Sequence, residues 1–397
     1  MKISLNSAIT APNNQNKGMS FTGARLPVPK LKPDEFIPNY KLTTFLLASD
    51  IDGTWKSAKP ELAKYSKILD NAIIQISENC AKVGINFHYG QVTARPAARV
   101  VSENITPGQF TMTDNGTTIW QGAPRLVTRP IAQEWEKIHK DSGFETDRLL
   151  GLVYGLLPNP RFRGMEVETV GVVVKNPAAD GCKYIASLCI PNESIKLDAA
   201  KGETAEIFDK ANYKTPSQVK EYMAELESQM KELGINYQIS PAYLFSGKPY
   251  VMFDIAAPHA NKGDAVRYMA KNLDPKNVIV AGDGGNDIAM MDNDGRSVIV
   301  VGNDKQLKDS VAKLTNNLVV IEDDAEKPCS IALLDGLVKV LKTKSHELFE
   351  KGLIKSEPDL DHLVLEPRAN DSATAWKDYF NSQDEKEAFK KTVGIFA

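Results

Sequence analysis

The sequence contains few residues of the kinds that build disulfide or zinc sites. There are 4 cysteines and 5 histidines among 397 residues. The cysteines are scattered and form no Cys-x-x-Cys pair, which argues against a disulfide framework or a structural zinc site. They are Cys80, Cys182, Cys189 and Cys329. We therefore expect buried thiols of a reduced compartment.

Long apolar runs and an excess of one charge are also lacking. No run approaches the ~18 residues of a membrane span, and the start, MKISLNSAITAPNNQNKGMSFTG, has no apolar stretch typical of a secretory signal. Lys+Arg number 48 and Asp+Glu 51, which gives a formal net charge of -3. Such a balance offers no strong field for nucleic acid or an anionic membrane. The sequence predicts a cytoplasmic protein whose partner is a small molecule.

The length predicts two domains with appendages, because 397 residues exceed a usual single domain. The first part is rich in Asn, Pro, Gly and Lys and is expected to be a flexible arm. In the last part, Trp376, Tyr379, Phe380 and Phe389 are spaced so that a helix could pack them on the body. The predicted divisions are 1–40 for the arm, 41–115 and 246–343 for a core, 116–245 for an inserted domain and 344–397 for a terminal extension.

Apolar runs alternate with helical patterns in the two core halves. KLTTFLLASDIDGT is typical of a buried parallel strand, and apolar residues at helical spacing follow from Glu61 to Gly84. Ile85 to Thr93, NVIVA, SVIVVG and NLVVIE are further strands, and a helix is expected from Gly263 to Leu273. The fold class is therefore α/β, with a doubly wound, Rossmann-like parallel sheet.

The middle of the chain has a different pattern, typical of an inserted α+β domain. We expect helices near Pro130 to Asp141 and near Pro216 to Gly234. The segments GLVYGLL, VETVGVVVK and YIASLCI have strand-like patterns.

Two acids stand where the first strand ends, in Ser49-Asp50-Ile51-Asp52-Gly53-Thr54. Gly53 permits the chain to turn there. A carboxylate at such a point can attack phosphorus, and a second one nearby can protonate the leaving oxygen and then deprotonate water. We predict that Asp50 and Asp52 are catalytic.

A second acidic segment, Gly282-Asp283-Gly284-Gly285-Asn286-Asp287, follows the strand NVIVA. Carboxylates that converge on one sheet edge repel each other unless a cation lies among them. Hard oxygen ligands of this kind suit Mg²⁺. The sequence thus predicts a magnesium site that includes Asp283 and Asp287.

Phosphoryl transfer also requires donors for the phosphoryl oxygens. Thr93 offers a hydroxyl at the end of the second strand, and Lys262 offers a positive charge in Asn261-Lys262-Gly263-Asp264. Asn286 adds an amide. These three residues are the predicted phosphate-binding groups.

The ordered motifs SDIDGT, VTAR, NKGDA and GDGGND resemble the four motifs of the haloacid dehalogenase superfamily. The resemblance covers about half of the chain. It implies a nucleophile at Asp50, a general acid/base at Asp52, and phosphoryl binding by Thr93 and Lys262. It also implies that Asp283 and Asp287 bind the metal, together with Asp50 and the backbone carbonyl of Asp52.

Motif spacing places the inserted domain. From Asp52 to Thr93 the chain advances 41 positions, whereas from Thr93 to Lys262 it advances 169. A cap must therefore lie between the second and third motifs, as in the C2-capped branch of Cof-like and sucrose-phosphatase-like hydrolases that this chain resembles. VTAR departs from that branch, which more often has glycine before the arginine, so Ala94 is expected to stiffen the loop slightly.

Several residues have simpler interpretations. Asp287 could merely cap a helix that begins near Ile288. Packing or surface roles are favoured for His88 and His259, and a solvated loop for Arg161 and Arg163. Arg95 is expected to anchor its own loop.

The leading hypothesis is a magnesium-dependent sugar-phosphate phosphatase that forms an aspartyl-phosphate on Asp50. A sugar phosphomutase and a non-catalytic phospholigand-binding or scaffold protein are the alternatives. The cap sequence names no substrate, and oligomeric state, pathway and the roles of the terminal extensions are not predicted.

Overall fold

The computed structural model of the chain describes residues 43–57, 59–102, 108–122, 132–170, 183–203, 215–242, 250–322 and 327–366. The expected arm at 1–40 lies outside the described residues, as do the four aromatic residues of the predicted terminal helix, Trp376, Tyr379, Phe380 and Phe389.

The larger sheet has seven strands in the order β11-β10-β9-β1-β2-β3-β4 within the described residues. Neighbours pair in parallel, except that β4 is antiparallel to β3. The strands are β1 (Thr44–Ser49), β2 (Asn86–Val92), β3 (Phe110–Thr113), β4 (Thr118–Gln121), β9 (Val278–Gly282), β10 (Ser297–Val301) and β11 (Leu318–Glu322). The chain runs outward from β1 in both directions, so the predicted doubly wound sheet is confirmed.

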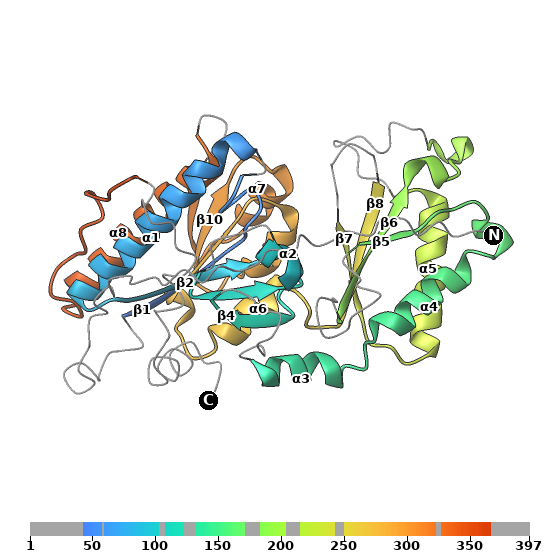
Figure 1. The fold of residues 1–397 in the computed structure, drawn as a ribbon, viewed down its shortest axis with the longest axis horizontal. Helices are drawn as coiled ribbons and strands as arrows, with labels where there is room; N and C mark the ends of the chain where they lie inside the picture. Colours follow the sequence, from blue (N-terminus) through green and yellow to red (C-terminus); the bar gives the residue numbers. More distant parts are fainter. Residues whose placement is uncertain are drawn as a thin grey trace, which may run out of the picture. The chain divides into compact units, whose positions relative to one another are not determined.

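Helices cover both faces of this sheet because successive side chains of a strand point to opposite faces. Phe45 and Leu47 pack in one apolar cluster with α1 (Ala63–Val83) and α8 (Cys329–Glu350). Leu46 and Ala48 pack in another cluster with α6 (Lys262–Met269) and α7 (Lys305–Val311). Figure 1 shows α1 and α8 running side by side.

Helix α1 follows the predicted apolar spacing. Leu69, Ile73, Ile76 and Cys80 recur at three- and four-residue intervals and are fully buried. Gly84 ends the helix with φ of 95°, a left-handed conformation that glycine adopts without steric cost.

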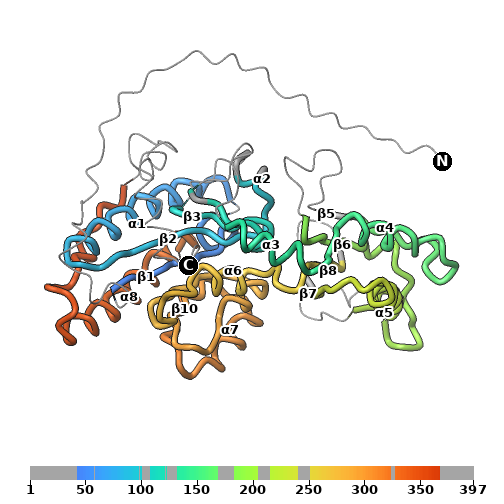
Figure 2. Tube along the Cα trace, turned by 90° about the horizontal axis from the view of Figure 1, so that it is seen from below, coloured from blue at the N-terminus to red at the C-terminus, as the bar shows by residue number. Residues whose placement is uncertain are grey.

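The smaller sheet has four antiparallel strands in the order β5-β6-β8-β7. They are β5 (Glu168–Val170), β6 (Ile185–Pro191), β7 (Gln238–Ala242) and β8 (Tyr250–Ala256). Helices α4 (Thr146–Leu156) and α5 (Ser217–Glu232) share an apolar cluster with this sheet. In Figure 2 the chain enters this part through α3 (Gln133–Asp141) and leaves it from β8 into α6.

Sheet membership differs from the expected bounds of the inserted domain. Strand β4, Thr118–Gln121, pairs in the larger sheet although it follows residue 116. Strand β8, Tyr250–Ala256, pairs in the smaller sheet although it follows residue 245. The domain bounds themselves stay a prediction.

The expected strand GLVYGLL is wrong, because this segment lies in helix α4 except for Leu157, which is the C-cap of that helix. Leu149, Val153 and Leu156 recur at helical intervals and are buried. Gly151 and Gly155 have nothing within 4 Å of a Cβ placed on them, so packing does not require glycine at either position. Glycine is also less favourable than most residues inside a helix, so both positions destabilise α4. Burial of one apolar stripe outweighs that cost.

Shorter helical elements connect the strands. Helix α2 spans Ala97–Ser102, and the 3₁₀ turns are η2 (Pro60–Leu62), η3 (Pro160–Phe162), η4 (Asn192–Ser194), η5 (Ala199–Lys201), η7 (Pro275–Asn277) and η8 (Gly285–Met290).

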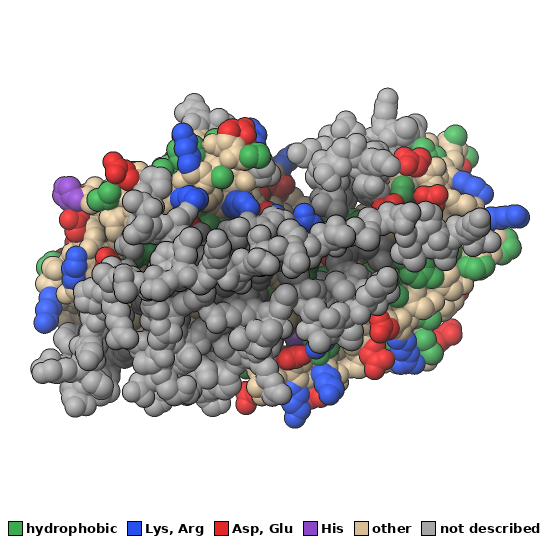
Figure 3. All heavy atoms as spheres, in the orientation of Figure 1, with side chains coloured by type: hydrophobic (Ala, Val, Ile, Leu, Met, Phe, Trp, Pro, Cys, Tyr) green, Lys and Arg blue, Asp and Glu red, His purple; other side chains and the backbone are tan. Residues whose placement is uncertain are grey.

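Buried thiols and mixed surface charge agree with the composition. Cys80, Cys189 and Cys329 are buried, as predicted, whereas Cys182 lies outside the described residues. On the face drawn in Figure 3, acidic and basic side chains alternate over the described surface. No helix in the described part of the chain combines the length and apolarity needed to cross a bilayer.

Candidate active site

Three adjacent strands bring their following residues to one edge of the larger sheet. Ser49, the last residue of β1, is in register with Gln91 on β2 and Ala281 on β9. The amide of Asp50 continues this pairing by donating to the carbonyl of Ala281 over 2.9 Å. The carboxyl ends of parallel strands are where open α/β sheets bind ligands.

Lys262 lies between two of the predicted catalytic and metal-binding acids. Its Nζ is 2.5 Å from Oδ1 of Asp50 and 2.7 Å from Oδ1 of Asp287. All three side chains are almost completely buried, with exposed fractions of 0%, 7% and 1% for Lys262, Asp50 and Asp287. A buried charge is stable only when it is paired, so this lysine and these acids form one interdependent unit.

Asp50, Asp283 and Asp287 each offer a carboxylate oxygen, and these oxygens lie within 4.8 Å of one another. Lys262 alone cannot balance three carboxylates. A hard divalent cation prefers oxygen ligands and would supply the missing positive charge. The donor set therefore fits Mg²⁺, as the sequence predicts.

The pKa values of these groups reflect burial and mutual repulsion. Burial raises the pKa of Asp50 well above its usual value, and the charges of Asp287 and Asp283 add to the effect against the opposing influence of Lys262. Burial, followed by the charge of Asp287, raises the pKa of Asp283 to about 7. For Lys262, burial acts to lower the pKa, but Asp287 and Asp50 together hold it above its usual value.

Asp283 is held by the loop that follows Asp50. The hydroxyl of Thr54 donates to Oδ1 of Asp283 over 2.8 Å. Gly53 has φ of +82°, and a Cβ placed on it would lie 2.2 Å from Oδ2 of Asp283, so glycine makes room for this carboxylate. The sequence predicted no role for Thr54, although its position in the first motif could have indicated a role in the site.

Asp287 has a capping role as well as its place in the acidic cluster. Its Oδ2 accepts from the amides of Asp283 and Gly284 at 3.0 and 3.1 Å, at the start of η8. Its other oxygen faces Lys262. The expected helix start near Ile288 is wrong, because η8 already begins at Gly285, but Asp287 does bind amides at the start of that turn. The same residue also contributes to the group that could hold a metal ion.

Asp52 lies outside this buried cluster. Its carboxylate is 47% exposed and accepts from Nε and Nη2 of Arg95 at 2.5 and 2.6 Å. Arg95 therefore contacts the predicted acid/base directly, whereas it was expected only to anchor its own loop. The catalytic role of Asp52 remains a prediction.

The other two predicted phosphate donors also lie outside the hydrogen-bonded cluster. Thr93 follows β2 and is buried, with its hydroxyl oxygen accepting from the amide of Arg95 over 3.0 Å. Asn286 is exposed on η8. The strand register places Thr93 at the same sheet edge as Asp50, so its predicted role stays open.

The remaining candidates have ordinary contacts. Nδ1 of His88 is 3.2 Å from Oε1 of Gln109, and Nδ1 of His259 is 3.2 Å from Oδ2 of Asp264. Arg161 of the inserted part binds Glu225 over 2.7 Å. These contacts agree with the packing and surface roles that the sequence favoured.

A family model matches part of the chain. The model of the family described as sucrose-6F-phosphate phosphohydrolase matches residues 201–339, which include Lys262, Asp283 and Asp287. This match confirms the predicted resemblance to sucrose-phosphatase-like hydrolases. Among proteins with curated descriptions, none matches the chain.

Solved structures of low sequence identity also resemble it. The sucrose-phosphatase from Synechocystis sp. PCC6803, in complex with sucrose and phosphate, is 18% identical with a TM-score of 0.46, over 75% of this chain and 97% of its own. The haloacid dehalogenase-like hydrolase yhjK from Bacillus subtilis is 16% identical with a TM-score of 0.42, over 74% and 91%. The subclass IIB sugar phosphatase BT4131 is 18% identical with a TM-score of 0.36, over 78% and 100%.

Proposed function

We propose that this chain is a magnesium-dependent phosphate monoester hydrolase that forms an aspartyl-phosphate on Asp50 and acts on a sugar phosphate. One observation carries the proposal: a buried carboxylate at a strand end, Asp50, contacts a buried lysine and lies close to two further acids. That arrangement combines a nucleophile with the charges that phosphoryl transfer requires.

In the first half-reaction, an oxygen of Asp50 forms a bond to phosphorus as the bond from phosphorus to the ester oxygen breaks. The ammonium of Lys262, 2.5 Å from Oδ1 of Asp50, is placed to balance negative charge on the phosphoryl oxygens. Asp52 gives its proton to the leaving oxygen. The products of this half-reaction are an alcohol and the aspartyl-phosphate.

In the second half-reaction, Asp52 takes a proton from water, the water oxygen attacks phosphorus, and Asp50 leaves as a carboxylate with release of phosphate. Both oxygens of Asp52 accept from Arg95 in this structure. The side chain must therefore exchange these contacts for contacts with the reacting oxygens during each turnover. Arg95 therefore competes with the reacting oxygens for the carboxylate of Asp52.

Asp50, Asp283 and Asp287 would hold the metal ion, with the carbonyl of Asp52 as the further ligand that the family resemblance implies. When bound, Mg²⁺ supplies positive charge that offsets the carboxylates and the phosphoryl oxygens. Thr54 and Gly53 favour this arrangement, since they fix the carboxylate of Asp283 beside the nucleophile's loop.

A sugar phosphate is the substrate class that the comparisons support. The matching family hydrolyses sucrose-6F-phosphate by its description, and its match here begins in the inserted part and continues through the third and fourth motifs. We infer that the inserted part closes over the phosphoryl site, excludes water and selects the leaving sugar.

A sugar phosphomutase would use the same first half-reaction but would return the phosphoryl group to a sugar. It would yield an isomerised sugar phosphate in place of inorganic phosphate. A phospholigand-binding scaffold would need Lys262 but would have no use for an acid/base such as Asp52.

The test is a Mg²⁺-dependent assay of phosphate release from a panel of sugar phosphates that includes sucrose-6F-phosphate, scored by kcat/KM. The proposal predicts release of inorganic phosphate that Asp50→Asn abolishes. Isomerised sugar phosphate without free phosphate would support the mutase. Ligand binding with no product of either kind would support the scaffold.

A further inference from the structure

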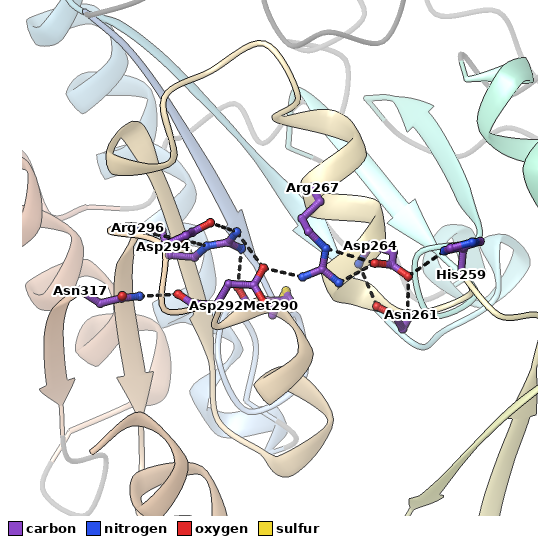
Figure 4. Close-up of polar contacts among 9 residues, drawn as sticks. All are labelled: His259, Asn261, Asp264, Arg267, Met290, Asp292, Asp294, Arg296 and Asn317. Carbon is purple, nitrogen blue, oxygen red and sulfur yellow. Dashed lines mark hydrogen bonds and ion pairs between the residues drawn. The ribbon is translucent and has the colours of Figure 1, made fainter. Parts of the chain in front are cut away.

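An exposed arginine connects the third motif to the loop after the fourth. Arg267, in α6, contacts Asp264 through Nε at 3.1 Å and Nη2 at 2.5 Å, and its Nη1 pairs with Asp292. Figure 4 shows Arg267 between these two acids. We call Arg267, Asp264 and Asp292 the arginine clamp.

On one side the clamp fixes the start of α6. Asn261 caps this helix by accepting from the amide of Asp264 over 2.8 Å, and its Nδ2 donates to Oδ2 of Asp264 over 2.9 Å. Lys262 is the next residue along the chain and the first of the helix. The carboxylate that binds Arg267 therefore also orders the residue that precedes the lysine of the active site.

On the other side the clamp is tied to η8. Asp292 binds Nη2 of Arg296 at 2.9 Å, and Nη1 of the same arginine donates to the carbonyl of Met290 over 2.6 Å. Met290 is the last residue of η8, whose first turn contains Asp287. Arg296 is 3% exposed, so this side of the clamp is anchored in the protein interior.

The two elements joined by the clamp are in very close contact. A Cβ placed on Gly263 would lie only 1.7 Å from the carbonyl oxygen of Ala289 in η8. Lys262 belongs to α6 and Asp287 to η8, and Nζ of the lysine is 2.7 Å from Oδ1 of the aspartate. A small shift of α6 along η8 would therefore change the position of the lysine relative to both acids.

We propose that the arginine clamp positions the Lys262 ammonium for phosphoryl transfer by locking α6 against η8. This inference rests on the function proposed above. Arg267 touches neither the nucleophile nor the phosphoryl site, so it is a positioning residue. The side chains of Arg267 and Asp292 are 43% and 37% exposed, and such pairs add little to overall stability. An effect on turnover can thus be separated from an effect on folding.

The test compares Arg267→Gln and Asp292→Asn in the full chain with Arg161→Gln as a matched control. Arg161 pairs with Glu225 in the inserted part at comparable exposure, away from these motifs. A displacement of a catalytic group by about 1 Å can cost about 100-fold in rate. If the clamp positions Lys262, we expect kcat/KM to fall at least about tenfold in both clamp variants, mostly through kcat. Their midpoint of thermal unfolding should not change. Arg267→Lys should recover part of the loss, and Arg161→Gln should stay within about twofold.

Asp292→Asn separates positioning from simple support of α6, because it keeps the contact between Arg267 and Asp264 within the helix. If Arg267 only stabilises α6, Asp292→Asn will retain wild-type kcat and KM, and that result overturns the proposal. Losses that merely follow the fraction of unfolded protein also overturn it.

Calorimetric binding of inorganic phosphate with Mg²⁺ present gives a second readout that needs no turnover. The clamp predicts binding at least about threefold weaker in Arg267→Gln and Asp292→Asn than in wild type or Arg161→Gln. If wild type binds phosphate but hydrolyses no ester, and the two clamp variants bind phosphate more weakly than Arg161→Gln, the phosphatase is overturned and the clamp is supported. If wild type hydrolyses sugar phosphates and the two clamp variants match it in turnover and in phosphate binding, the clamp alone is overturned. Absence of both hydrolysis and phosphate binding in wild type would overturn both.

Discussion

The ammonium of Lys262 lies 2.5 Å from the carboxylate of Asp50, although 212 positions separate them in the chain. Both side chains are buried, so neither charge can be relieved by water. The pairing is possible because β1 and the start of α6 meet at the same edge of the sheet. It places a nucleophile and a positive charge where a phosphoryl group would bind.

Replacing Lys262 by methionine should leave Asp50 and Asp287 as uncompensated buried carboxylates. Removal of one partner from a buried pair typically costs about 3–5 kcal/mol, so we expect the free energy of unfolding to fall by about 3 kcal/mol without Mg²⁺. Saturating Mg²⁺ should recover most of this loss but not activity. Denaturant unfolding with and without Mg²⁺ measures it, and an unchanged midpoint in the metal-free protein would contradict the pairing.

Asp52→Asn should lower kcat on a sugar phosphate by about 10²–10⁴-fold, the usual contribution of an acid or base. With p-nitrophenyl phosphate the leaving group needs no proton, so the first half-reaction should be nearly spared and phosphoenzyme should accumulate. Rapid-quench kinetics with both esters separates the two steps. Equal losses in the first step for both esters would exclude Asp52 as the acid.

The metal-free protein should lose stability as pH rises. The pKa of folded Asp283 is about 7, above its ordinary value of 3.8, so the folded state keeps a proton that the unfolded state has released. Stability therefore declines between about pH 4 and 7. The decline is a few kcal/mol at most, because a tenfold change in proton affinity corresponds to about 1.4 kcal/mol.

Thermal unfolding of wild type and Asp283→Asn across this range isolates that effect. The comparison is needed because burial lowers the pKa of His139 to about 4, so protonation of the unfolded chain opposes the trend below about pH 6.5. Mg²⁺ should raise the wild-type midpoint more at about pH 8 than at about pH 5. If the unfolding midpoints of wild type and Asp283→Asn change with pH in parallel, Asp283 does not cause the loss of stability.

Thr54→Val should weaken Mg²⁺ binding, because the hydroxyl that orients Asp283 is lost while side-chain volume is kept. The lost hydrogen bond should also cost about 1 kcal/mol of stability. Thr54→Ser retains the hydroxyl and serves as the control. Calorimetric Mg²⁺ titration decides, and equal affinity in Thr54→Val and wild type would show that this contact does not order the metal-binding acids.

Much of the fold could be predicted because local pattern and tertiary burial agree there. The strand before Asp50 and the helix that ends at Gly84 both combine a clear apolar period with an end signal. The segment 151–157 was misassigned because two glycines interrupt a short apolar run, which leaves its period ambiguous. Only the burial of Leu149 and Val153 against the smaller sheet reveals the helix.

The site was predictable where residues follow strands, and unpredictable where side chains meet across loops. Strand ends place Asp50 and Asp283 together, as their motifs indicate. The pairing of Arg95 with Asp52 and that of Arg267 with Asp292 depend on loop geometry and have no sequence pattern of their own. These two pairings are known only from the structure.

The most direct test of the account is to quench the enzyme in acid during turnover of a phosphate ester and to map the phosphoryl group by mass spectrometry of the proteolytic peptides. We expect an acid-stable, base-labile phosphoryl group on Asp50 that disappears when substrate is exhausted. In Asp50→Asn we expect no phosphoryl group and no turnover. Full turnover of Asp50→Asn, or phosphate release by wild type with Asp50 never modified, would contradict the central claim.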